Sequence, residues 1–110
     1  MIQAGPGAAG ASSFEIATTS PGRLTARGAL TFTTAKRAWA QGLATLRKAG
    51  GITIDCAAIS QTDSAGLAVL LDWLAEARRA GRSLRYEQLP QGLLGLARIS
   101  SVDELLQKGV

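Results

Sequence analysis

The chain has 110 residues, 46% of them hydrophobic, which is enough for one compact core and excludes a large multidomain enzyme. Its formal charge of +4 comes from twelve Lys and Arg against eight Asp and Glu. These basic residues are scattered along the sequence, so the chain lacks the basic stripe with interleaved aromatics that is typical of nucleic-acid binding.

Cysteine and histidine usage limits the chemistry further. The chain has one cysteine and no histidine, so it forms no internal disulfide and has almost no ligands for a zinc site. We therefore expect a reducing compartment and neither a metal nor a cofactor. No segment approaches the roughly 18 consecutive apolar residues that cross a membrane, and the opening MIQAGPGAAGASS lacks the pattern of a secretory signal. These features predict a cytoplasmic protein without direct membrane insertion.

The first twelve residues predict a flexible lead-in to a single domain. They are rich in Gly, Ala and Ser and have almost no large apolar side chains, so they cannot bury enough surface to offset the cost of ordering. The folded domain is therefore expected to cover residues 13 to 110, with residues 1 to 12 as the lead-in.

From residue 14 onwards the hydrophobic pattern predicts alternating strands and helices. Period-two alternation and turn residues predict an antiparallel hairpin, and a short run that starts with β-branched residues predicts a buried central strand. Apolar residues at helical spacing predict the helices. The expected strands are residues 14 to 18, 24 to 30, 51 to 58 and 83 to 89, and the expected helices run from a cap at Thr33 or Thr34 to about residue 49, from Ser64 to Ala80, over residues 91 to 99 and, as a short turn, over residues 103 to 106. This order, β-β-α-β-α-β-α, predicts a single small α/β domain with a mixed sheet covered by helices.

The junction between the central strand and the following helix carries the strongest functional signal. Ser64 begins the helix, where free backbone N–H groups and the helix dipole create a positive field. It can cap the helix, contact a partner or accept a phosphate, and the residues alone leave these roles open. Asp63 precedes it and Asp55 ends the central strand, and both are expected to hydrogen-bond loop backbone. No histidine, base-activated nucleophile or Walker-type loop accompanies these carboxylates, so we assign no catalytic residue.

The helix that follows Ser64 predicts a surface for a partner. At about 100° per residue, four leucines of this helix share the face that covers the sheet. Ala65, Val69 and Trp73 fall on the other side, which predicts an outward apolar seam with the tryptophan as an anchor. In the alternative, Trp73 leans back onto the core. Gly66 is expected to allow a close contact, because helix propensity alone would favour alanine there.

The segment ITIDCAAISQTDSAGLAVLL resembles the motif of STAS domains (sulfate transporter and anti-sigma-factor antagonist), which runs from a buried strand with an Asp to Asp-Ser or Asp-Thr, a small residue, Gly and Leu. The hairpin before it and the strand GRSLRYEQL after it fall where that family places them, so the resemblance covers about residues 14 to 106. Within the family, the short chain and the C-terminal segment LPQGLLGLARISSVDELL resemble the small STAS subunit of phospholipid-transport ABC complexes of Gram-negative bacteria.

This resemblance implies a non-enzymatic regulatory subunit that binds and supports the ATPase of an ABC transporter, in a complex with permease and lipid-binding subunits that maintains outer-membrane lipid asymmetry. It also implies a peripheral place at the cytoplasmic face of the inner membrane, reached through the partner. The expected partner-binding residues are Asp63, Ser64, Ala65, Gly66, Val69 and Trp73, and Asp55 is expected to structure the loop. Such subunits often have threonine and a second glycine where this chain has Ser64 and Ala65. The alternative is therefore an anti-sigma-factor antagonist switched by phosphorylation of Ser64.

Overall fold

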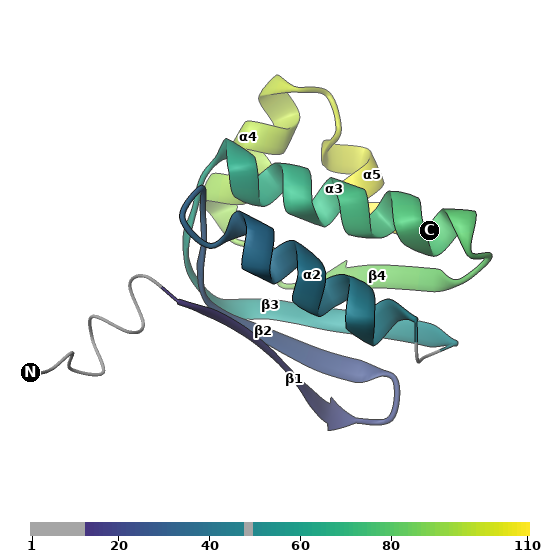
Figure 1. Cartoon of the computed structure of the whole chain (residues 1–110). Helices are drawn as coiled ribbons and strands as arrows, with labels where there is room; N and C mark the ends of the chain where they lie inside the picture. Colours follow the sequence, from purple (N-terminus) through teal and green to yellow (C-terminus); the bar gives the residue numbers. More distant parts are fainter. Residues whose placement is uncertain (1–12, 48–49) are drawn as a thin grey trace, which may run out of the picture.

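The computed structural model describes residues 13 to 47 and 50 to 110, and the lead-in predicted for residues 1 to 12 lies outside them. The strands are β1 (Phe14–Ser20), β2 (Arg23–Leu30), β3 (Gly51–Thr62) and β4 (Ser83–Glu87), and the helices are α2 (Ala35–Leu46), α3 (Ser64–Arg79), α4 (Gln91–Ile99) and α5 (Asp103–Lys108). The strands form one sheet in the order β1-β2-β3-β4, with β1 antiparallel to β2, and β3 parallel to β2 and β4. The helices named here cover one face of that sheet (Figure 1). The predicted α/β class, mixed sheet and element order are confirmed.

The central strand β3 is longer than its sequence pattern predicts. It continues to Thr62 instead of ending near residue 58, because its second half pairs with β2 up to the partners Leu30 and Thr62. Two register shifts interrupt this pairing. Each shift breaks the period-two alternation of side chains between the faces, which is why the second half of the strand has the pattern of a loop.

The connection from β2 to α2 differs from the expected hydroxyl cap. The structure places Thr34 at the N-cap position of α2 without a side-chain cap hydrogen bond. Its Oγ1 instead donates to the Ala29 carbonyl oxygen at 2.7 Å and accepts from the Thr31 N–H at 3.0 Å. Thr34 is buried, so its side chain satisfies loop backbone groups that water cannot reach. It thereby fixes the loop of residues 31 to 34 to the end of β2.

The prediction that Val69 and Trp73 form an outward seam on α3 is wrong. Trp73 is 0% exposed and Val69 is 5% exposed. The indole of Trp73 lies against Gly42 of α2, where a Cβ atom would overlap the ring, and its Nε1 donates to the Trp39 carbonyl oxygen at 3.2 Å. The sheet is therefore not the only layer that covers α3: α2 packs alongside it and buries a second side of the helix (Figure 1). The alternative placement of Trp73 in the core is the one observed.

Gly66 makes its close contact inside the domain. It is buried, and a Cβ atom at this position would overlap the carbonyl oxygen of Leu30 at the end of β2. The prediction that Gly66 belongs to an exposed partner-binding surface is therefore wrong, because the missing side chain lets α3 approach the sheet.

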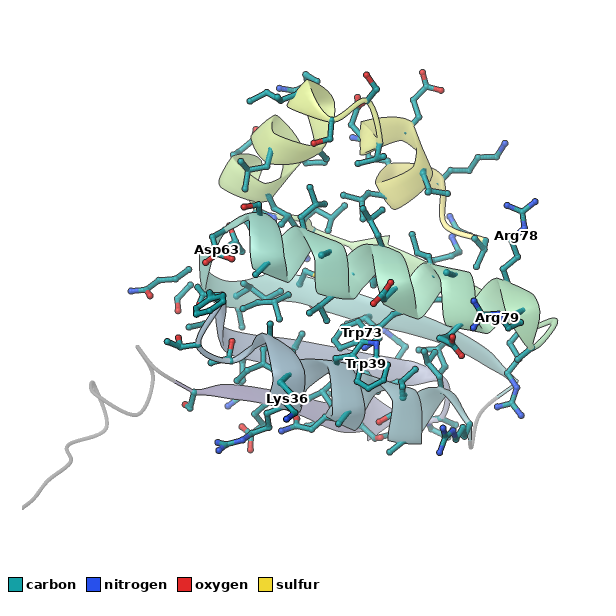
Figure 2. The ribbon with its side chains drawn as sticks, turned by 45° about the horizontal axis from the view of Figure 1, so that its top comes forward. Lys36, Trp39, Asp63, Trp73, Arg78 and Arg79 are labelled. Carbon is teal, nitrogen blue, oxygen red and sulfur yellow. The ribbon has the colours of Figure 1, made fainter. Side chains whose placement is uncertain are left out.

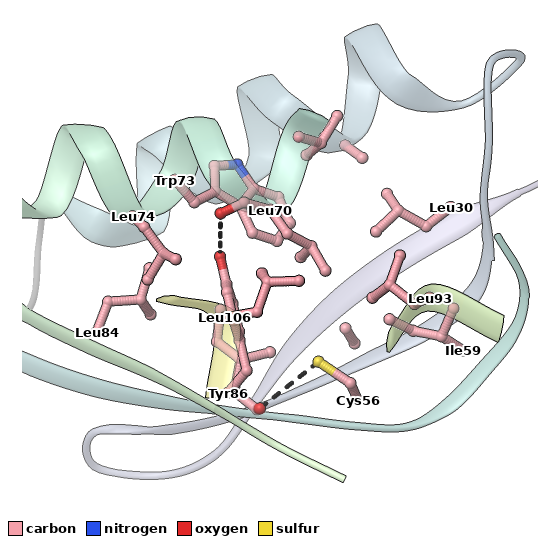
Figure 3. Packing of buried hydrophobic residues seen from close by; sticks show 14 of the residues in the cluster. Leu30, Cys56, Ile59, Leu70, Trp73, Leu74, Leu84, Tyr86, Leu93 and Leu106 are labelled. Atoms are coloured by element: carbon pink, nitrogen blue, oxygen red, sulfur yellow. Dashed lines mark hydrogen bonds between the residues drawn. The ribbon is translucent and has the colours of Figure 1, made fainter. Parts of the chain in front are cut away.

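Further along α3, the buried Tyr86 hydroxyl donates to the Leu70 carbonyl oxygen at 2.6 Å and ties the helix to β4 (Figure 3).

Candidate functional site

The N-terminus of α3 is capped by Asp63 and not by Ser64. One carboxylate oxygen of Asp63 accepts hydrogen bonds from the N–H groups of Ala65 at 2.9 Å and Gly66 at 3.1 Å. Its backbone is extended, with φ −150° and ψ −171°, as an N-cap residue requires. Of the three roles that the sequence leaves open for Ser64, capping is therefore not the one observed, and Ser64 is the first residue of the helix proper.

Asp63 also joins two segments that are distant in sequence. Its second carboxylate oxygen accepts from the Phe32 N–H at 2.9 Å, so the loop between β2 and α2 is held against the start of α3. The hydrogen bond from the Phe32 N–H is the main cause of the lowered pKa of the Asp63 carboxyl group. Partial desolvation opposes it, and the N–H groups of Gly66 and Ala65 lower the pKa further. Hydrogen bonds to the charged form stabilise that form, so Asp63 is a carboxylate at neutral pH.

Ser64 is exposed at this junction. Its hydroxyl makes no hydrogen bond to any other described residue. The two N–H groups that could bind a phosphate on this side chain, those of Ala65 and Gly66, already donate to the Asp63 carboxylate. A phosphoryl group on Ser64 would therefore project outward beside a negative charge. The contact and phosphate-acceptor roles both stay predictions.

Phe32 is the residue of this site that the sequence pattern does not reveal. Its side chain is 81% exposed although it is large and apolar, and its backbone is fixed by Asp63 next to Ser64. Phe32 lies at the end of an apolar strand series, among threonines, and that setting is equally typical of a buried strand residue. Phe32, Asp63, Ser64 and half-buried Ala65 together form what we call the docking corner.

The second exposed aromatic residue is on α2. Trp39 is 40% exposed, whereas Trp73 on α3 is buried beside it (Figure 2). Trp39 on α2, and not Trp73 on α3, is thus the tryptophan with an exposed side chain. The exposed aromatic surface of the domain is contributed by the β2–α2 loop and by α2.

Asp55 does not belong to the docking corner. It lies within β3 rather than at its end, and its carboxylate accepts from the Ala57 N–H at 2.9 Å. This contact falls at the register shift between β2 and β3, so Asp55 stabilises a bulge in the strand and not the loop before α3. Eight residues of extended chain span roughly 25 Å, which separates Asp55 from Asp63 by too much for joint acid–base chemistry.

The single thiol is equally unsuited to nucleophilic chemistry. Cys56 is 0% exposed, and burial raises the pKa of its thiol to about 12. A thiol in this state is protonated and inaccessible at neutral pH.

Among residues 13 to 47 and 50 to 110, no three His, Cys, Asp or Glu side chains are grouped so that they could hold a metal ion. In the same residues, no helix has both the length and the apolar character needed to span a bilayer.

A mixed four-stranded sheet with its helices on one face, and an exposed serine beginning the helix after the central strand, is the arrangement of a STAS domain. A family model described as "Mlab, STAS domain" matches residues 15–107, and the chain belongs to this family of MlaB-like STAS domains. A solved structure titled "Structure of the Anti-Sigma Factor Antagonist SpoIIAA in its Unphosphorylated Form" matches with a TM-score of 0.60 and 13% sequence identity, covering 88% of this chain and 99% of that one. The curated proteins include no significant match. At this identity, the likeness to SpoIIAA shows the fold.

Proposed function

We propose that the chain is an MlaB-like, non-enzymatic adaptor subunit that binds and supports the MlaF-like ATPase of an ABC phospholipid transporter. In this role it acts with permease and lipid-binding subunits to maintain outer-membrane lipid asymmetry, at the cytoplasmic face of the inner membrane and held there by its partner. The family match over residues 15–107 supports the MlaB-like assignment. The observation that carries the proposal is the exposed Phe32 side chain, held beside Ser64 by Asp63.

Phe32 has the properties of an interface anchor. Aromatic side chains on fixed backbone contribute much of the energy of protein interfaces, because they bury a large apolar area at a small entropic cost. Moving an exposed Phe side chain into an apolar pocket is worth roughly 1.5–3 kcal/mol. Asp63 and Ser64 supply a carboxylate and a hydroxyl at the edge of the same corner, which would give polar contacts around the aromatic anchor.

The test is reconstitution with an MlaF-like ATPase subunit of an ABC phospholipid transporter. We expect Phe32→Ala to weaken binding roughly tenfold to a hundredfold, and to lower ATP hydrolysis by the complex, with little change in the melting temperature of the isolated chain. Ile99→Ala is the matched control, because Ile99 is 83% exposed on α4 and outside the docking corner. Equal weakening by the two substitutions, or no effect of the whole chain on ATPase assembly and activity, would contradict the proposal.

A second candidate function is an anti-sigma-factor antagonist switched by phosphorylation of Ser64. The exposed Ser64 hydroxyl, without a hydrogen-bond partner among the described residues, favours it. A phosphoryl group there would add negative charge beside Asp63 and repel an acidic partner surface. The chain should then gain the mass of one phosphoryl group when it is incubated with ATP and an anti-sigma-factor kinase, and Ser64→Ala should not. An unchanged mass of the wild-type chain would argue against this candidate.

A further inference from the structure

A shallow apolar trough lies at the opposite end of α3 from the docking corner. It consists of two adjoining hollows of about 320 Å³ and 420 Å³ between the second half of α3, α5 and the end of the chain. Its apolar lining includes Leu71 and Leu74 of α3, Leu105 of α5 and Val110. Arg78 follows Ser64 by fourteen positions of the helix, roughly 21 Å along the axis, and Figure 2 shows Asp63 and Arg78 at the two ends of the helix.

Both walls of the trough are fixed. Val110 forms reciprocal backbone hydrogen bonds with Leu84, at 2.9 and 3.4 Å, so Val110 is held alongside β4. On the other side, Leu74 of α3 is buried in the core. Leu105 is 39% exposed between these walls. The backbone that carries this apolar surface is therefore already fixed. A ligand that binds here does not have to order it, which lowers the entropic cost of binding.

The charged side chains around the trough are basic, and some of them make no ion pair. Arg78 lines both hollows and Lys108 lines the larger one, and the side chain of neither makes an ion pair or hydrogen bond with another described residue. Arg79 pairs with Glu76, and Arg82 donates to the Leu46 carbonyl oxygen. No carboxylate side chain is among the residues that line the two hollows.

The ends of two helices bring basic residues to this trough. Arg78 and Arg79 lie in the last turn of α3 and Lys108 lies in the last turn of α5, where cations complement the carbonyl end of a helix. Arg78 and Lys108 also line the same hollow. Two cations from different elements thus border one apolar surface. Such an arrangement matches a ligand that is both apolar and anionic.

We propose that this trough binds an acidic amphipathic segment of a partner protein. One or two aliphatic side chains of the segment cover Leu105 and its neighbours, and carboxylates on either side pair with Arg78 and Lys108. A peptide fits better than a lipid, because the hollows are open along their length and would leave an acyl chain largely in water. This site is separate from the docking corner, and its assignment does not depend on the proposed function.

The test uses a fluorescein-labelled helical peptide of about twelve residues, roughly 18 Å long, built of Glu and Leu, and fluorescence anisotropy at physiological salt. The double substitution Arg78→Glu, Lys108→Glu should weaken binding about tenfold or more. Lys36→Glu, Arg37→Glu on α2 makes the same change in net charge at exposed positions and should have little effect. Leu105→Gln should also weaken binding, as should replacement of Leu by Ala in the peptide.

Three results would overturn the proposal. Equal weakening by the two double variants would mean that peptide binding depends only on the net charge of the chain and not on the trough. Unchanged binding of the Leu-to-Ala peptide would mean that the apolar surface is not used. Binding of phosphatidylglycerol vesicles that needs Arg78 and Lys108, without binding of the peptide, would assign the trough to a lipid surface instead. Melting temperatures of the variants close to that of the wild-type chain confirm that each comparison is made on folded protein.

Discussion

Replacing Trp73 by alanine tests whether this side chain is part of the hydrophobic core, where it is 0% exposed. Loss of a buried Trp side chain costs about 3–5 kcal/mol. The upper end of this range applies, because the indole packs against Gly42, which has no side chain to fill the cavity. The lost hydrogen bond from Nε1 to the Trp39 carbonyl oxygen adds to the cost. Domains of this size are stabilised by about 5–15 kcal/mol, so Trp73→Ala should be close to the limit of stable folding.

Trp39→Ala is the matched control for that experiment. Trp39 is 40% exposed on the neighbouring helix, so truncating it removes less buried apolar area and should lower the free energy of unfolding clearly less than Trp73→Ala does. Urea denaturation followed by circular dichroism measures both variants. Trp39→Ala also leaves Trp73 as the single tryptophan, whose emission should be that of a buried indole until the domain unfolds. A Trp73→Ala variant as stable as the wild-type chain would refute the placement of this side chain in the core.

Further predictions concern the N-terminal end of α3 and the buried thiol. Asp63→Ala should cost about 0.5–2 kcal/mol at neutral pH. The lowered pKa of the Asp63 carboxyl means that this stabilisation is complete above the unfolded-state pKa of about 3.9 and is lost as the pH falls through the folded-state value, so urea titrations of the two proteins should converge in acid. Gly66→Ala should destabilise the domain by about 1–3 kcal/mol in the same assay, despite its better helix propensity, because the methyl group overlaps the Leu30 carbonyl. Cys56 should resist iodoacetamide at about pH 8 in the folded protein and react on unfolding. Ser64→Ala should leave the free energy of unfolding within about 0.5 kcal/mol of wild type, and a larger loss would show that Ser64 has a structural role.

The order of elements could be predicted from sequence because each segment has a clear period and clear boundaries. Gly81 at the end of α3 and the glycines at the start of β3 mark their elements in both sequence and structure. The second half of β3 could not be predicted, since the bulge at Asp55 to Ala57 depends on a hydrogen bond that the pattern does not encode. The register of a strand is a property of its partner as much as of its own residues.

In the candidate site, too, local sequence predicts some features, whereas others depend on contacts between distant segments. The motif around Asp63 and Ser64 predicts where the helix after the central strand begins, because its residues are neighbours in sequence, and α3 begins at Ser64. Phe32 is 31 positions away from Asp63 and reaches the site through one backbone hydrogen bond, so no local pattern connects the two. Trp73 was misplaced because a helical wheel gives the faces of a helix but not the number of layers that cover them. In this fold α2 covers the face that the wheel leaves open.

Capping by Asp63 leaves Ser64 free for recognition. The carboxylate already satisfies the first N–H groups of α3 and fixes the Phe32 backbone with its other oxygen. A partner that buries Phe32 therefore orders one side chain and not a loop, which lowers the entropic cost of association. The helix behind the corner is also held in place, since Tyr86 donates to the Leu70 carbonyl oxygen. The geometry of the docking corner is therefore set by the core, while the residues that a partner would read stay on the surface.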